Sequence, residues 1–281
     1  SHPQFEFISG SVSDPQLVAD LVPEADDVYH LAAAVGVALI AKRPIETIER
    51  NIYPTQLLLT ELKKQHDSGR DTRFFLASTS EVYGKNPKET WTEEDDLVLG
   101  ATTRPRWAYG ASKAIDEFLA LAHWRESRLP VVIGRFFNVV GPRQTGAYGM
   151  VLPRFVTAAV AGNPLIVHDD GAQIRCFAHV ADIVQFVEDL MNSPAALGQV
   201  VNIGSAEPVS IRELAERVVA SAESSSTLEF QSYSEAYDKD FEDVRRRIPD
   251  VSKLESLVTH RPRFRLDDII AELVRTKQDE L

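Results

Sequence analysis

Tyr109 and Lys113 have the residue types and the spacing of an acid–base pair. Residues at positions i and i+4 lie on one face of a helix, so a helix here would place the ammonium beside the phenol. A tyrosine that acts as a base near neutral pH must have its pKa lowered by about three units, worth roughly 4 kcal/mol, and an adjacent cation lowers it directly. The pair alone is a weak signal, because an exposed amphipathic pair has the same spacing.

A second group of reactive side chains directly follows an apolar run. Residues 74–77 predict a buried strand, and Ser78, Thr79, Ser80 and Glu81 come at its carboxyl end. Open α/β sheets bind ligands at that edge, where the Thr79 hydroxyl could share the proton that Tyr109 removes from a substrate. A lone Glu81 would more often be a solvated or helix-capping acid, but its neighbours Val82, Tyr83 and Gly84 favour a catalytic interpretation.

Short apolar runs alternate with helical stretches, which predicts right-handed crossovers and a doubly wound parallel sheet. After Pro142 the pattern loosens, which indicates a smaller, substrate-facing lobe. The expected strands are residues 5–8, 28–33, 74–78, 131–136, 165–168 and 200–203. The expected helices are residues 15–21, 45–65, 109–125, 153–161, 180–191 and 211–221.

Composition narrows the class of protein. The net charge of −12 over 281 residues repels polyanions at long range, so we expect no nucleic-acid partner. The one cysteine, Cys176, cannot form an internal disulfide, and the amino terminus lacks a signal-peptide pattern. No apolar run reaches the roughly 20 residues that cross a bilayer. We therefore expect a cytoplasmic protein without a membrane partner, and no pattern predicts a metal site.

The beginning of the chain lacks a feature that a dinucleotide-binding fold requires. No G-x-G-x-x-G turn occurs in the sequence, and nothing before Phe5 can supply a first strand and a phosphate-binding turn. We therefore expect either that the first βαβ unit is missing or that the domain cannot hold a dinucleotide in the usual way. Residues 1–6 also match a streptavidin-affinity tag, but the alternation that continues to Ile8 favours a native segment.

Seven stretches, taken together, resemble the extended short-chain dehydrogenase/reductases that epimerise, dehydrate or decarboxylate nucleotide sugars. They are residues 10–14 (GSVSD), 30–33 (HLAA), Asn51, 78–84 (STSEVYG), Tyr109 with Lys113, 135–143 (RFFNVVGPR) and 249–253 (PDVSK). The resemblance covers nearly the whole chain. It implies an NAD-binding Rossmann-like domain over residues 1–142, to which strand 131–136 belongs. It also implies a nucleotide-sugar-binding lobe over residues 143–281, with segments that return to the sheet.

The resemblance also implies a role for each matching residue. Thr79 would be the hydroxyl partner, Tyr109 the base, and Lys113 the cation that lowers the tyrosine pKa and holds the nicotinamide ribose. Ser80, Glu81 and Arg175 would complete the catalytic group. The adenosine and pyrophosphate side of NAD would contact Ser11, Val12, Leu31, Ala32 and Ala33, although Ser11 replaces the usual aspartate. The nucleotide sugar would contact Asn138, Arg175 and Arg247.

Several reactions begin with oxidation at the sugar C4, and Glu81 bears on the choice among them. A 4-epimerase needs no carboxylate beside the threonine, whereas dehydratases and decarboxylases have one. Dehydratases commonly have aspartate where this chain has Ser80, and residues 99–100 and 105–109 resemble UDP-glucuronate decarboxylases. The expected reaction is therefore decarboxylation of UDP-glucuronate to UDP-xylose or its 4-keto precursor. The alternatives are a nucleotide-sugar 4,6-dehydratase or 4-epimerase and, from another class, a non-catalytic nucleotide-binding or regulatory relative.

The resemblance further implies a homodimer that pairs through the helices holding Asn51 and Tyr109. The apolar positions that could form this surface are Leu57, Leu58, Phe118, Leu119 and Ala122. The alternative is that all of them face the core.

Overall fold

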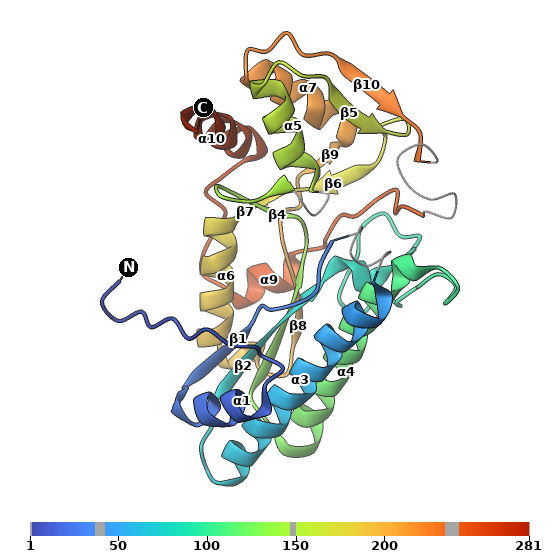
Figure 1. Ribbon diagram of the computed structural model, residues 1–281. Helices are drawn as coiled ribbons and strands as arrows, with labels where there is room; N and C mark the ends of the chain where they lie inside the picture. The colour runs from blue at the N-terminus through green and yellow to red at the C-terminus, as the bar shows by residue number, and fades with distance from the viewer. Residues whose placement is uncertain (1, 37–42, 147–149, 234–241, 281) are drawn as a thin grey trace.

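The computed structural model describes residues 2–36, 43–146, 150–233 and 242–280, and its centre is a parallel sheet. Four strands lie in the order β1-β2-β3-β8, and every pair is parallel (Figure 1). Their bounds are β1 Asp27–His30, β2 Arg73–Thr79, β3 Val131–Phe136 and β8 Val200–Ile203. The chain thus adds β8 to the sheet after building only part of the second lobe.

Helices cover both faces of this sheet, which explains why its strands are apolar on both sides. Helices α3 (Pro44–Asp67) and α4 (Ala108–Ser127) pack on one face, and α6 (Val180–Asn192) and α9 (Ser252–Leu257) on the other (Figure 1). Successive side chains of a strand point to opposite faces. Accordingly, Phe74 and Leu76 of β2 belong to the α3–α4 core, and Phe75 packs in the α6–α9 core. The prediction of a doubly wound α/β sheet is confirmed.

The second lobe lies beyond the carboxyl ends of the central strands (Figure 1). Three helices, α5 (Val151–Val160), α7 (Ile211–Ser221) and α10 (Leu266–Asp279), share one apolar core with β5 (Leu165–His168). β5 pairs in parallel with β10 (Leu228–Gln231). Two further pairs are β4 (Val139–Val140) with β7 (Ala178–His179), and β6 (Ile174–Cys176) with β9 (Pro208–Ser210). Among the described helices, none is both long and apolar enough to cross a bilayer.

Most expected elements are present, often with the expected bounds, and one is wrong. Helix α1 (Pro15–Leu21) begins where Asp14 accepts hydrogen bonds from the backbone of Gln16 and Leu17. Residues 5–8, however, form no strand, and Phe5 and Phe7 are 64% and 78% exposed. An alternating sequence becomes a strand only beside a neighbouring strand, and no described strand pairs with this segment. The expected strand at 28–33 ends at His30, and the sequence did not predict α10.

Candidate active site

Thr79 and Tyr109 meet where the carboxyl end of β2 contacts the first turn of α4. Thr79 is the last residue of β2 and accepts a hydrogen bond from the backbone N–H of Glu81 at 3.2 Å. That bond starts the short helix η2 (Ser80–Tyr83). The Tyr109 hydroxyl also hydrogen-bonds to Thr79. The two groups are therefore close enough to share one proton.

A glycine lets the two elements approach each other. Gly110 lies in the first turn of α4, and a Cβ atom at this position would be 2.6 Å from the carbonyl oxygen of Glu81. Cβ atoms essentially never approach an oxygen so closely, so any larger residue would push α4 away from η2. Gly110 thereby permits the contact between Tyr109 and the end of β2.

A buried amide joins α4 to the loop after β1. The Asn51 Oδ1 atom accepts from the backbone N–H of Ala34 at 2.8 Å, and its Nδ2 donates to the Ser112 hydroxyl at 2.9 Å. Ser112 in turn donates to the carbonyl oxygen of Tyr109 at 2.8 Å. Asn51 of α3 therefore positions the loop that contains Leu31, Ala32 and Ala33 against the helix of Tyr109.

A charged cluster behind the site joins β2, β3 and α4. Arg135 donates to Glu117 through Nη2 at 2.7 Å and through Nε at 3.0 Å, and both side chains are buried. Ser78 donates to the same carboxylate. Two parallel guanidinium–carboxylate bonds are geometrically specific. This cluster therefore holds the strand end and the helix in one arrangement.

The pKa of Tyr109 is raised in this structure, not lowered as the spacing to Lys113 predicted. The Lys113 ammonium is buried and lies 2.7 Å from the Asp116 carboxylate, one turn further along α4. Burial raises the pKa of Tyr109 to about 12, and the charge of Glu81 adds to the rise. The hydrogen bond from Thr79 and the charge of Arg247 oppose that rise without overcoming it. Tyr109 is therefore a neutral phenol at physiological pH.

Glu81 lies between two arginines and is ionised. Its carboxylate is 2.5 Å from the guanidinium of Arg106 and 2.6 Å from that of Arg247. Burial alone would raise the pKa of Glu81, but the charges of Arg247 and Arg106 outweigh it and bring the pKa to about 2. Arg247 also donates to the Ser80 hydroxyl. Ser80, Glu81 and Arg247 thus come together, although Arg247 is 166 residues further along the chain than Glu81.

Arg175 lies on β6 beside this group, where a second acid holds it. Its guanidinium donates to both oxygens of Asp243, at 3.1 and 3.2 Å. Burial lowers the pKa of Arg175, and the charges of Asp243, Arg247 and Glu81 also act on it. The amide of Asn138 donates to the carbonyl oxygen of Cys176, the residue that follows Arg175. Arg175 and Arg247 thus lie near each other beside Glu81, and each is paired with a carboxylate.

A family model, GDP-mannose 4,6 dehydratase, matches residues 1–273 of this chain. The chain belongs to the GDP-mannose 4,6-dehydratase family. A UDP-N-acetyl-alpha-D-glucosaminuronate decarboxylase from Bacillus cytotoxicus is 37% identical, over 94% of this chain and 80% of the relative. UDP-glucuronic acid decarboxylase 1 from Arabidopsis thaliana is 31% identical, over 98% of this chain and 59% of the relative.

Solved structures of the same architecture support the assignment to this family. A UDP-glucuronic acid 4-epimerase from Bacillus cereus, in complex with UDP-glucuronic acid and NAD, is 25% identical with a TM-score of 0.86. The match covers 100% of this chain and 83% of that chain. A dTDP-glucose 4,6-dehydratase from Streptomyces venezuelae with NAD bound is 28% identical with a TM-score of 0.85, over 99% of this chain and 80% of the other. The predicted resemblance to nucleotide-sugar epimerases, dehydratases and decarboxylases is confirmed.

The residues predicted to contact the adenosine side of NAD lie near β1, at the edge of the central sheet. β1 pairs only with β2 among the described strands, and Leu31, just past its end, is 62% exposed. Ala32 and Ala33 continue this loop, and Ser11 and Val12 lie just before α1. The loop from Leu31 to Ala33 is therefore accessible at this edge, where the adenosine and pyrophosphate side of a dinucleotide was expected. The sequence still lacks a glycine-rich turn for its pyrophosphate.

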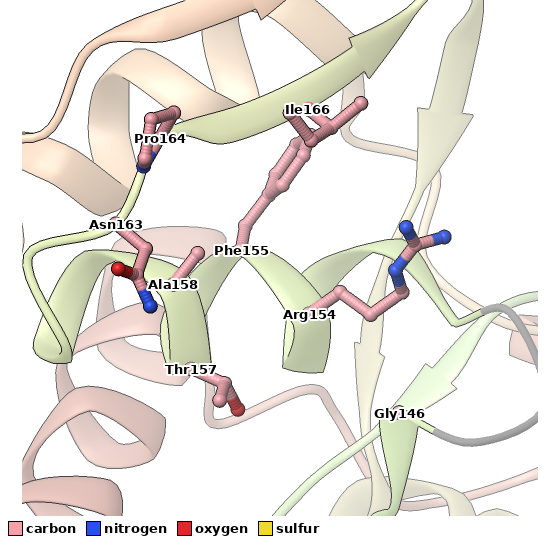
Figure 2. Close-up of a pocket in the computed structure, with 8 residues that line it drawn as sticks. All are labelled: Gly146, Arg154, Phe155, Thr157, Ala158, Asn163, Pro164 and Ile166. Carbon is pink, nitrogen blue, oxygen red and sulfur yellow. The ribbon is translucent and has the colours of Figure 1, made fainter.

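A pocket of about 410 Å³ lies in the second lobe, between α5 and the beginning of β5 (Figure 2). Arg154, Thr157 and Asn163 supply polar groups, and apolar side chains complete its lining. Burial lowers the pKa of His168, and the charge of Arg154 adds to that lowering. His168 stacks on Tyr233 at a ring-centroid distance of 6.2 Å, and Tyr233 donates to Asp243 at 2.6 Å. Asp243, the partner of Arg175, is thus linked to His168 through Tyr233.

The sequence analysis missed three residues of this site. They are Arg106, Asp116 and Asp243, which pair with Glu81, Lys113 and Arg175 respectively. Only Asp116 had a readable signal, because it stands three residues after Lys113 in a predicted helix. The contacts of Arg106 and Asp243 join separate elements and have no local sequence pattern.

Proposed function

We propose that this chain is an NAD-dependent decarboxylase of a UDP-hexuronate, acting through a 4-keto sugar. The observation that carries the proposal is the site itself, with Thr79 and Tyr109 beside an ionised Glu81 and two arginines. The relatives that are 37% and 31% identical are UDP-sugar decarboxylases, which favours loss of CO₂ over loss of water. Glu81 has a pKa of about 2 and cannot donate a proton to a leaving hydroxyl at neutral pH.

The first step requires Tyr109, Thr79 and Lys113. Tyr109 would take the proton of the sugar C4 hydroxyl, and Thr79, hydrogen-bonded to it, would share that proton. The chemistry that NAD would supply when bound is reversible hydride transfer at the sugar C4. Lys113 would hold its nicotinamide ribose, and Ser11, Val12 and the loop from Leu31 to Ala33 would line its adenosine and pyrophosphate side.

The second step, loss of CO₂, uses Arg175 and Arg247. Oxidation at C4 makes the uronic acid a β-keto acid, which loses CO₂ without a protein acid. Arg175 would place the carboxylate, or supply the proton to the enolate that remains at C5, while Arg247 and Asn138 would hold the nucleotide sugar. We infer that the nucleotide extends from Arg175 into the second lobe, toward the pocket that Arg154 lines.

Three features of the whole protein belong to the same proposal. Residues 1–142 would form the NAD-binding part and residues 143–281 mainly the nucleotide-sugar lobe. The protein would act as a homodimer. It would work in the cytoplasm, where its one cysteine, buried Cys176, stays reduced.

One experiment tests the reaction and the substrate together. The chain is incubated with NAD⁺ and either UDP-glucuronate or UDP-N-acetylglucosaminuronate, and CO₂ and the sugar product are measured. Release of CO₂ with a five-carbon sugar supports the proposal. The substrate that reacts faster shows whether the enzyme prefers a hydroxyl or an acetamido group at C2 of the sugar. Inversion at C4 with retention of the carboxylate would make the protein a 4-epimerase. Loss of water from a UDP-hexose would make it a dehydratase, and mere binding of the nucleotide a non-catalytic relative.

A further inference from the structure

Asp116 is a buried carboxylate that the reaction itself does not use. It lies on α4 one turn after Lys113, and its Oδ2 atom is 2.7 Å from the lysine ammonium. The exposed fractions of the two side chains are 0% for Asp116 and 2% for Lys113. Buried ion pairs contribute little net stability compared with well-packed apolar side chains, so stability is a poor reason for a carboxylate here.

The other charged groups around this pair are accounted for. His30 of β1 faces Lys113, and burial together with the lysine charge lowers the pKa of His30 to about 4, so it is neutral. Thr55 of α3 is uncharged, and its hydroxyl donates to the carbonyl oxygen of Asn51 at 3.0 Å. Glu117, the next acid on α4, is paired with Arg135. Asp116 is therefore the group that offsets the charge of Lys113.

That offset reaches Tyr109, because the tyrosine responds to the sum of nearby charges. Glu81 and Asp116 act to raise the pKa of Tyr109, and Arg247 acts to lower it. Glu81 is itself held between two arginines. Asp116 instead pairs with Lys113, which stands four residues after Tyr109 on α4. Removing the charge of Asp116 would leave the field of Lys113 uncompensated.

We propose that Asp116 is a positioning residue that holds Lys113 and offsets part of its charge, so that the ammonium activates Tyr109 less than an unpaired lysine would. The proposal rests on the proposed function only for the role of Tyr109 as the base. Burial and the charge of Glu81 act in the same direction as Asp116, so the phenol stays protonated in the free protein at neutral pH.

Titration of Tyr109 in the protein without cofactor tests this coupling. Isotope-labelled tyrosine at Cζ reports the ionisation of each phenol by NMR, and Tyr109→Phe identifies the signal. Asp116→Asn should lower the midpoint of Tyr109 by about one pH unit, whereas Asp116→Glu should restore it. Asp27→Asn is a charge-matched control, because Asp27 pairs with Arg73 at the opposite end of the sheet and should leave the midpoint unchanged.

A midpoint that stays the same or rises in Asp116→Asn would overturn the proposal. If that variant does not fold, Asp116→Ser gives the same comparison with a smaller side chain. Circular dichroism defines the pH range in which the protein is folded. When a midpoint lies above that range, the fraction of Tyr109 that is ionised at the highest folded pH is compared between the native protein and the variant. With NAD⁺ and an active substrate, the acid limb of kcat/KM should shift to lower pH in the same variant. The NMR titration needs no turnover, so failure of the proposed reaction leaves this test intact.

Discussion

Arg175 can contact either a carboxylate or a phosphate, and its neighbours allow both. Its guanidinium is buried, held by Asp243 and close to Arg247 and Glu81. If Arg175 places the substrate carboxylate, Arg175→Ala should weaken binding of UDP-glucuronate by about 2 to 5 kcal/mol, the cost of breaking a buried charge pair. UDP-glucose, which lacks the carboxylate, should be affected much less. Calorimetric titration of both ligands measures this difference, and equal losses would assign Arg175 to the phosphates.

Glu81 makes the free energy of unfolding depend on pH. The pKa of this carboxyl is about 2 in the folded chain and about 4.5 in an unfolded chain. Its contribution, about 3 kcal/mol, is fully present above pH 4.5 and is lost as the pH falls toward 2. Urea unfolding at pH 7 and pH 3 should show a loss in the native protein that exceeds the loss in Glu81→Gln by about 2 kcal/mol. Parallel losses in both proteins would contradict the charged state assigned to Glu81.

At the scale of elements, Gly110 decides how closely α4 approaches η2. An alanine inside a helix normally raises stability by about 1 kcal/mol relative to glycine. Here the added Cβ atom would meet the carbonyl oxygen of Glu81 at 2.6 Å, so Gly110→Ala should instead lower the free energy of unfolding by about 1 to 3 kcal/mol. Turnover should fall as well, because Tyr109 moves away from Thr79. Chemical denaturation measures the sign, and a more stable variant would show that the contact is not close.

At the scale of the whole molecule, the outer face of α4 carries apolar side chains toward solvent. Phe118 is 65% exposed, and Ile115 on the same helix is also exposed. Of the other positions predicted for a dimer surface, Leu58 is in the core, whereas Leu57 and Leu119 are partly buried. We expect a homodimer through this face, so Phe118→Asp should give a monomer without a large loss of stability. Light scattering at micromolar concentration measures the mass, and a native protein that is already monomeric would refute the expectation.

The sequence by itself determined the family, the doubly wound sheet and the strand end and helix that contain Thr79 and Tyr109. Such features are local, because apolar periodicity and the spacing between Tyr109 and Lys113 are set by a few consecutive residues. It erred at residues 5–8, where the alternation is correct but a strand also needs a neighbouring strand.

Only the tertiary structure decided the electrostatics of the site. The spacing of Lys113 predicted a depressed tyrosine pKa, yet burial and the charges of Glu81 and Asp116 raise the pKa of Tyr109 to about 12. Arg106 and Arg247 meet Glu81 from separate elements, and Asp243 meets Arg175 across 68 residues of chain. Charge interactions depend on distance in space and on burial, and neither can be read from residue spacing once the partners lie on different elements.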